Sequence, residues 1–140
     1  MNYNIVESNM EDANFIEERI VEFNASNVPF TAPIPFSKIN KNIKNENGEI
    51  IAGINCVYYA WHCLLIDALW VNSDYRNNGL GTDLLNSIEL SAKEFGIKLI
   101  HVDTFDFQAK DFYIKLGYEV FGVQNDCPPG HKRYYLQKTI

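Results

Sequence analysis

The chain has 140 residues, of which 46% are hydrophobic and 14% aromatic, and its formal net charge is −6. This length suits a single domain over residues 1–140, and the hydrophobic fraction excludes a mainly disordered chain. The acidic balance argues against nucleic-acid binding, which needs clustered lysines and arginines. No apolar stretch reaches the ~20 residues that span a membrane. Three cysteines without a CxxC pair, and no signal peptide, predict reduced thiols and a cytoplasmic protein.

The first third of the chain predicts a short strand, a helix and a hairpin. Residues 4–6 are the first strand, and a helix runs from residue 9 or 11 to 24 because apolar residues recur there with a helical period. Three prolines exclude a regular helix over residues 28–36. That segment is either a packed connector or the wall of a substrate pocket. Strands are predicted over 37–44 and 49–59, joined by an Asn-Gly turn.

The remaining two thirds alternate between strands and helices. Strands are predicted over residues 63–71 and 99–105, with a helix over 84–95 between them. A strand–helix–strand unit of this length is a crossover, so the two strands should be parallel neighbours. A second helix is predicted over 108–116, and final strands over 118–124 and 133–138.

The segment from Arg76 to Thr82 joins the apolar strand to the helix and carries two glycines. Glycine lets the backbone approach a ligand closely, and the N–H groups of a helix start attract anions. The segment therefore predicts a phosphate or pyrophosphate site, and the alternative is a helix start that only needs tight glycine packing. A dinucleotide fingerprint fails because Leu84 stands where a third glycine is needed, and a P-loop fails for lack of Gly-Lys-Ser/Thr.

A second pattern lies downstream of this loop. The two patterns are Arg76-x-x-Gly79-x-Gly81 and Ala109-x-x-Phe112-Tyr113-x-x-x-Gly117-Tyr118. Together they resemble the GNAT superfamily of acyl-coenzyme A-dependent N-acetyltransferases, most clearly over residues 50–123. The resemblance implies a single-domain α/β fold with a mixed, mostly antiparallel sheet. In such a fold, a central parallel strand pair is splayed at the cofactor site, and helices lie on both faces.

The resemblance also implies an activity and a set of cofactor contacts. An acetyl group would pass from acetyl-CoA to a primary amine by direct attack in a ternary complex. The pantetheine arm would pair with the backbone of Leu69, Trp70 and Val71, with the Trp70 side chain in the core, and Phe112 would pack nearby. The pyrophosphate would lie on the loop formed by Arg76, Asn77, Asn78, Gly79, Leu80, Gly81 and Thr82.

Two residues are the candidates for proton transfer. Tyr113 matches the tyrosine that many family members use as general acid, and the alternative is a core aromatic. Several members carry a catalytic glutamate where this chain has Leu65. Asp67 shares its strand face and is the candidate base, since burial would raise its pKa. The alternatives are a structural carboxylate bonded to the backbone or to His101, or a base role for His101 or Asp103.

The remaining sequence features limit the possible ligands and support one alternative function. The three histidines and three cysteines do not fall at ligand spacings, so no metal is expected. Asp106 stands where the family often has asparagine, and its charge would be disfavoured near phosphate. With Leu65, it supports the alternative of a non-catalytic acyl-CoA-binding module. The acceptor would be a small-molecule or peptide amine, and exposed edge strands permit a homodimer.

Overall fold

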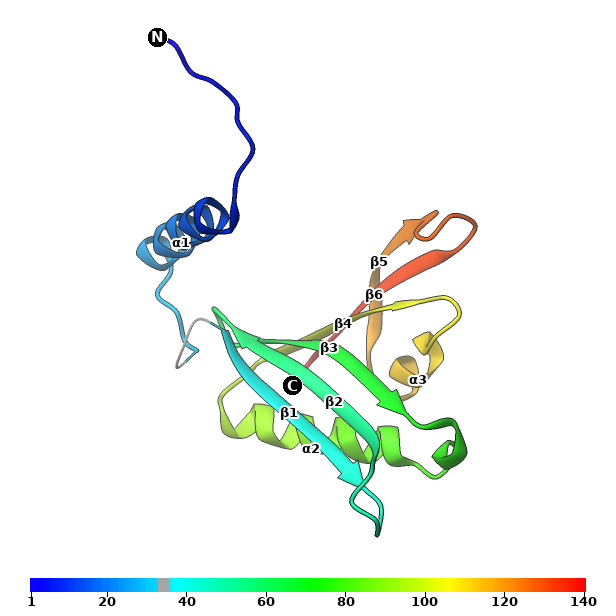
Figure 1. Ribbon diagram of the computed structural model, residues 1–140. Coiled ribbons are helices and arrows are strands. Elements are labelled where there is room, and N and C mark those ends of the chain that lie inside the picture. The colour runs from blue at the N-terminus through cyan, green and yellow to red at the C-terminus, as the bar shows by residue number, and fades with distance from the viewer. Residues whose placement is uncertain (33–35) are drawn as a thin grey trace.

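A six-stranded sheet forms the centre of the molecule, with the strand order β1-β2-β3-β4-β6-β5 (Figure 1). The computed structural model describes residues 1–32 and 36–140. The strands are β1 (Phe36–Lys44), β2 (Ile50–Tyr59), β3 (Cys63–Val71), β4 (Leu99–Phe105), β5 (Glu119–Asn125) and β6 (Lys132–Thr139). The helices are α1 (Met10–Asn27), the 3-10 turn η1 (Ser73–Tyr75), α2 (Leu80–Glu94) and α3 (Lys110–Lys115).

The sheet confirms the predicted architecture. Only β3 and β4 pair in parallel, and every other neighbouring pair is antiparallel. The bounds of β3 and β4 coincide with the predicted strands, whereas α2 begins at Leu80 because the glycine loop itself forms its first turn. The predicted strand over residues 4–6 is wrong: these residues have no regular structure, and Ile5 is fully exposed.

The parallel pair separates part-way along its length. The β3–β4 ladder runs from Cys63 opposite Leu99 to Ile66 opposite Val102 and then stops. Beyond that point β3 stays paired with β2 as far as Val71, and β4 stays paired with β6 as far as Phe105. The two strands are thus held apart by their outer neighbours, and the predicted splay is confirmed.

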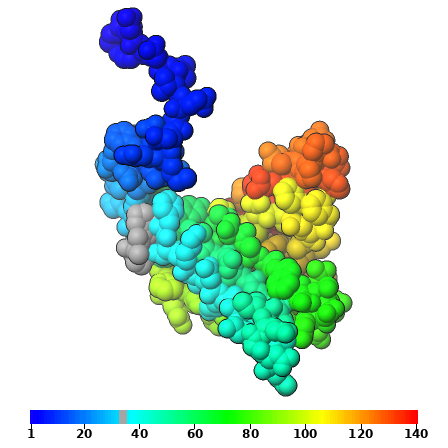
Figure 2. Space-filling view, in the orientation of Figure 1, coloured from blue at the N-terminus to red at the C-terminus, as the bar shows by residue number. Residues whose placement is uncertain are grey.

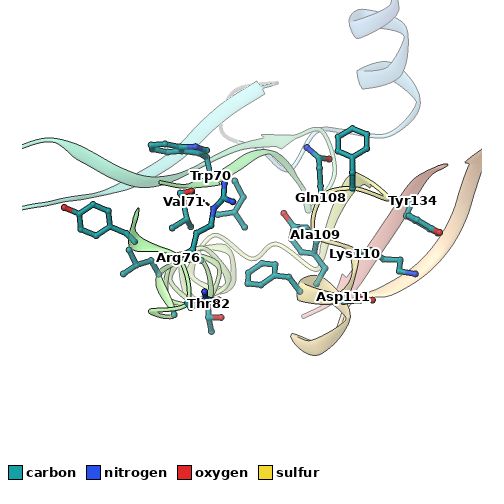
Figure 3. A pocket seen from close by; sticks show the side chains of 18 of the residues that line it. Trp70, Val71, Arg76, Thr82, Gln108, Ala109, Lys110, Asp111 and Tyr134 are labelled. Carbon is teal, nitrogen blue, oxygen red and sulfur yellow. Dashed lines mark hydrogen bonds between the residues drawn. The ribbon is translucent and has the colours of Figure 1, made fainter. Parts of the chain in front are cut away.

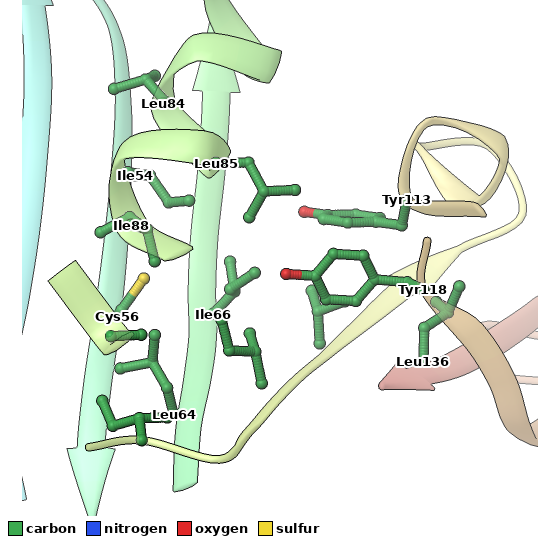
Figure 4. Packing of buried hydrophobic residues seen from close by; sticks show 14 of the residues in the cluster. Ile54, Cys56, Leu64, Ile66, Leu84, Leu85, Ile88, Tyr113, Tyr118 and Leu136 are labelled. Carbon is green, nitrogen blue, oxygen red and sulfur yellow. The ribbon is translucent and has the colours of Figure 1, made fainter. Parts of the chain in front are cut away.

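The hydrophobic core lies between α2, α3 and one face of the sheet (Figure 4). Leu85 and Ile88 of α2 are fully buried against Ile54 of β2 and Leu64 of β3. Period-two alternation places these strand residues on one face and their neighbours on the other. Tyr113 of α3 enters the same core, so both helices cover this single face.

The opposite face of the sheet is open among the described residues. A row of side chains crosses it from Lys38 through Val57, Leu65 and His101 to Gln137, and all of them are half-buried or exposed. α1 stands off from the sheet and has no buried residue (Figures 1 and 2). Helices on both faces were expected, but the helices in residues 1–32 and 36–140 cover only one face within this chain.

The predicted helix near the N-terminus is confirmed. It begins at Met10, where the Asn9 side chain accepts a hydrogen bond from the Asp12 N–H and the Asp12 carboxylate accepts one from the Asn9 N–H. This reciprocal capping box satisfies two N–H groups that a helix start leaves free. Residues 33–35 of the predicted connector 28–36 lie outside the described residues.

A charged pair ties the last long strand to the helices on the packed face. The Lys138 ammonium on β6 donates to both carboxylate oxygens of Glu89 on α2, at 3.0 and 3.1 Å. It also donates to the Leu116 carbonyl at 2.9 Å, and the Tyr118 hydroxyl donates to Glu89 at 3.0 Å. The side chains of Glu89 and Lys138 are 14% and 27% exposed, so each depends on the other for solvation.

Replacing Lys138 with methionine should destabilise the protein. The substitution keeps the aliphatic stem but leaves the Glu89 carboxylate mostly buried without its ammonium, which typically costs about 1.5–3 kcal/mol. Urea denaturation followed by circular dichroism measures the change. Arg19→Met is the control, because Arg19 pairs with Glu22 on the exposed surface of α1. Equal stabilities of the two variants would contradict this role of Lys138.

Candidate functional site

A cavity of about 940 Å³ opens where β3 and β4 part (Figure 3). One wall is the end of β3 with the loop and the first turn of α2, and the other is the segment from Asp106 to Tyr113 with β6. Figure 3 shows Arg76 and Thr82 on the first side and Lys110 and Tyr134 on the second. The predicted cofactor contacts that line the cavity are Leu69, Trp70, Val71, Arg76, Asn77, Gly79, Leu80, Gly81, Thr82 and Phe112.

The N-terminus of α2 faces this cavity with its N–H groups uncapped. Gly79 is the N-cap residue with φ +75°, a left-handed conformation that glycine adopts without strain. Among the described residues, no side chain caps this helix start. Its first-turn N–H groups, at the positive end of the helix dipole, are therefore available to an anion.

Gly81 sets how closely α3 approaches this helix start. A Cβ atom built on Gly81 would lie 3.4 Å from Cζ of Phe112 and 3.8 Å from Cγ2 of Val71. A Cβ atom would therefore just fit, and a larger side chain at this position would push Phe112 away from the first turn of α2. The two halves of the sequence pattern meet here, although 30 residues separate Gly81 from Phe112.

Some polar residues of the loop line the cavity, and others stabilise the turn. The Arg76 side chain lines the cavity and donates from Nε to the Val71 carbonyl at 3.3 Å. Asn77 lines it with φ 65°, a left-handed angle that asparagine tolerates better than most residues. Asn78 is not among the lining residues. Its Nδ2 donates to the carbonyls of Tyr75 and Arg76, so it braces the turn.

The far wall adds a cation that the sequence analysis did not single out. The Lys110 ammonium lies 4.6 Å from the centre of the Tyr134 ring, and both residues line the cavity. Lys110 directly follows Ala109 of the second sequence pattern, so its place near the site could have been predicted from the sequence. Tyr134 had none, because its position depends on β6 pairing with β4, where Tyr134 lies opposite Thr104. The cavity thus has Arg76 and Lys110 on opposite sides.

Trp70 differs from its predicted place. It was expected in the core, but its side chain is 50% exposed and lines the cavity. The edge of β3 that faces β4 has no ladder partner beyond Ile66 among the described residues. Backbone groups of residues 69–71 on that edge are therefore placed to pair with an extended ligand, as an added strand would.

Asp106 lines the cavity, but its carboxylate is engaged by the loop before β6. One oxygen accepts from Nδ1 of His131 at 2.8 Å and the other from the Lys132 N–H at 2.9 Å. These two bonds, the backbone bond first, lower the pKa of Asp106. The carboxylate therefore fastens the end of β4 to the start of β6, and both of its oxygens accept hydrogen bonds from that loop.

Tyr113 lies at the border between the cavity and the core. It is 4% exposed, and its ring packs edge-on against Phe112 and Tyr118 at centroid distances of 5.1 and 5.7 Å. Figure 4 shows its hydroxyl directed toward Leu85. Burial, followed by the charges of Cys56 and Asp103, raises the pKa of Tyr113. The phenol therefore keeps its proton at neutral and moderately alkaline pH.

Asp67 lies away from this cavity and is exposed, so the expected burial is wrong. It borders a separate hollow of about 130 Å³ on the open face of the sheet, beside Lys38 and Asn40. The alternative in which the Asp67 carboxylate bonds to His101 finds no such bond among the described residues. His101 instead has its Nε2 2.6 Å from the Tyr59 hydroxyl, and burial, partly opposed by Asp103, lowers the pKa of His101.

Comparison with known proteins agrees with these features. The model of the "Acetyltransferase (GNAT) family" matches residues 12–118. The chain belongs to the GNAT acetyltransferase family. It is 38% identical over 96 residues to a blasticidin-S acetyltransferase of Streptomyces morookaense, covering 68% of this chain and 70% of that protein. As a member of this family, the protein is an acetyl-CoA-dependent N-acetyltransferase.

Solved structures support the same fold. An acetyltransferase from Bacillus cereus ATCC 14579 has a TM-score of 0.92 at 35% identity, covering 99% of this chain and 98% of that one. A streptothricin acetyltransferase homologue from Bacillus anthracis, solved in complex with acetyl coenzyme A, has a TM-score of 0.67 at 21% identity, covering 79% of this chain and 66% of that one. The GNAT fold is thus confirmed for this chain.

No three His, Cys, Asp or Glu side chains among the described residues lie close enough together to hold a metal ion. None of the helices in residues 1–32 and 36–140 is long and apolar enough to cross a membrane.

Gly81→Val should weaken coenzyme A binding at least tenfold. The added side chain would collide with Phe112 and push α3 away from the first turn of α2. Isothermal titration calorimetry with coenzyme A measures the loss. Gly122→Val on β5 is the control, because its Cβ would meet only Tyr135 at an ordinary 3.8 Å. Unchanged affinity in a folded Gly81→Val protein would show that this approach is not part of the site.

Proposed function

We propose that the cavity between β3 and α3 binds acetyl-CoA and that the enzyme transfers the acetyl group to a primary amine within a ternary complex. The observation that carries this proposal is the parting of β3 and β4 next to the uncapped start of α2. An extended ligand with a phosphate at one end fits both features, since one offers free backbone and the other an anion site.

The residues of the cavity divide the binding between them. The N–H groups of the first turn of α2 and the Arg76 guanidinium would hold the pyrophosphate, with the Thr82 hydroxyl as a further donor. Lys110 on the opposite wall adds a second positive charge. Residues 69–71 would align the pantetheine arm along β3, which brings the thioester into the gap between the strands.

Transfer forms a C–N bond and breaks the C–S bond of the thioester. The amine loses a proton, and the departing thiolate gains one. Tyr113 is our candidate proton donor because it borders the cavity and its raised pKa keeps the phenol protonated. Holding both reactants in one complex is itself a large contribution, since it removes the entropy cost of bringing them together.

His101 is better placed than Asp67 to accept the proton of the amine. Leu65, where several family members carry a catalytic glutamate, pairs directly with His101 in the parallel ladder. The side chain of His101 therefore lies next to that position on the same face of the sheet. Its lowered pKa leaves the imidazole neutral at pH 7, so it can accept a proton. Asp67 on the open face is the competing candidate.

The acceptor is proposed to be a small cationic molecule with a primary amine. Support comes from the net charge of −6, which attracts cations, and from the 38% identity with a blasticidin-S acetyltransferase. A peptide N-terminus is the second candidate class.

A screen of amines tests the activity and the acceptor together. Purified protein is mixed with acetyl-CoA and a panel that includes blasticidin S, polyamines, aminoglycosides and short peptides, and release of free thiol is followed by colour. Turnover should appear with cationic small molecules. Stabilisation by acetyl-CoA in a thermal-shift assay, without thiol release on any amine, would instead favour a non-catalytic acyl-CoA-binding module.

Tyr113→Phe should lower kcat by about 10²–10⁴, the usual range for loss of a general acid, while leaving the dissociation constant for acetyl-CoA unchanged. The ring is kept, so its packing against Phe112 and Tyr118 survives. Tyr118→Phe is the matched control, because its hydroxyl donates to Glu89 in the core. A kcat equal to that of the unsubstituted enzyme would remove Tyr113 as the acid.

The pH profile separates the two candidate bases. A base works only when deprotonated, so kcat should fall as the pH falls through the pKa of His101, which lies below its usual 6.5. His101→Gln should abolish this acid limb and lower kcat, whereas Asp67→Asn should keep it. If the limb disappears in Asp67→Asn and persists in His101→Gln, Asp67 is the base.

A further inference from the structure

α1 presents an apolar stripe to solvent. Ala13, Ile16, Ile20 and Phe23 recur at three- and four-residue spacing and so share one side of the helix. Ile16, Ile20 and Phe23 are 59%, 53% and 63% exposed, and no residue of α1 is buried. Most stability of a helix in a protein comes from packing of such a face, so α1 needs a surface to cover it.

The segment after α1 is fixed to the body of the same chain. The Val28 carbonyl accepts from Nε1 of Trp61 at 2.8 Å, and the Phe30 ring lies 5.6 Å from the Trp61 ring. The Thr31 N–H donates to the Ala60 carbonyl at 2.8 Å. These contacts anchor the C-terminal end of α1 and direct the helix away from its own sheet, as Figures 1 and 2 show.

Nothing in the described part of the chain covers the open face of the sheet, which is partly apolar. Val57, Tyr59 and Leu65 lie on it, half-buried, in the middle strands of the sheet. Phe121 extends the apolar surface on β5, where its ring lies 6.3 Å from the Tyr135 ring and is 55% exposed. A stable domain buries both a helix stripe and a sheet face against another layer.

We propose that α1 of each copy packs on the open face of a second copy, so that the protein is a reciprocal, helix-swapped dimer. One chain supplies the stripe and its partner supplies the sheet, and two-fold symmetry makes both contacts identical. Charge agrees with this arrangement. α1 carries five acidic residues and one arginine, and β1 carries Lys38 and Lys44 on its exposed side. The inference does not depend on the acetyl-transfer proposal.

The similarity to the Bacillus cereus acetyltransferase supports the extended position of α1. Residues 1–27 are about one fifth of this chain. A TM-score of 0.92 over 99% of the chain requires that this fifth lies in a corresponding place in that protein. A helix that two chains of 35% identity both hold away from the body points to a contact outside the single chain.

The swap would also complete the side of the sheet that carries the candidate bases. Asp67 and the His101–Tyr59 pair all lie on the open face. In the proposed dimer, α1 of the partner covers the sheet beside them. The acceptor would then enter between the sheet of one copy and the helix of the other.

Light scattering coupled to gel filtration tests the dimer with the full-length chain. The expected mass is about twice 16.1 kDa. The double variant Ile16→Glu and Ile20→Glu, which charges the stripe, should run at the monomer mass, and so should Val57→Lys, which charges the open face. Leu90→Glu is the matched control: Leu90 is 64% exposed on α2, outside both surfaces, and this variant should remain dimeric. Circular dichroism verifies that each variant is folded.

Mixing the two monomeric variants gives the decisive result. Chains with a charged stripe keep an intact open face, and Val57→Lys chains keep an intact stripe. One of the two contacts of a mixed dimer is therefore whole, and a fraction of dimer mass should return. A helix that folds back on its own sheet predicts no such recovery. A monomeric full-length protein, a dimer that survives charging of the stripe, or no dimer in the mixture would each overturn the proposal.

Discussion

The parting of β3 and β4 is the constraint on which the candidate site depends. Two parallel strands would ordinarily stay paired to their ends. Here each of them is also hydrogen-bonded to an antiparallel neighbour, and that pairing extends beyond the end of the parallel ladder. β2 holds β3 out to Val71, and β6 holds β4 out to Phe105. The gap that results exposes backbone on two strand edges at once. The start of α2 and the start of α3 both lie at this gap, so the strand pairing and the two helix starts together form the cavity.

The two faces of the sheet differ in burial, because helices cover one face and leave the other open. One face is packed by α2 and α3 and contains the core, with Lys138 and Glu89 joining the last strand to the helices. The other face has half-exposed apolar residues and the polar side chains of Asp67 and His101. The core and the proposed acid Tyr113 therefore lie on one side, while both candidate bases and the proposed contact with a second copy lie on the other.

The protonation states of the two proposed proton carriers have the same cause. Burial disfavours a charged side chain, so it raises the pKa of the Tyr113 phenol and lowers that of the His101 imidazole. At neutral pH one group holds a proton and the other lacks one, which is the pairing that acetyl transfer to an amine needs.

The sequence by itself determined the order of elements after residue 9, the parallel pair and the glycine loop before α2. These depend on local signals: apolar runs over 63–71 and 99–105, and glycines at 79 and 81 that relieve steric limits on the backbone. Only the tertiary structure decided that Trp70 lines the cavity, that Tyr134 faces Lys110 and that His101 pairs with Leu65, because each depends on which strand lies beside which. The placement of α1 belongs to the same group. Its apolar stripe predicts that the helix packs against another surface. Helical periodicity shows which side of the helix is apolar, but it does not show where the matching surface lies.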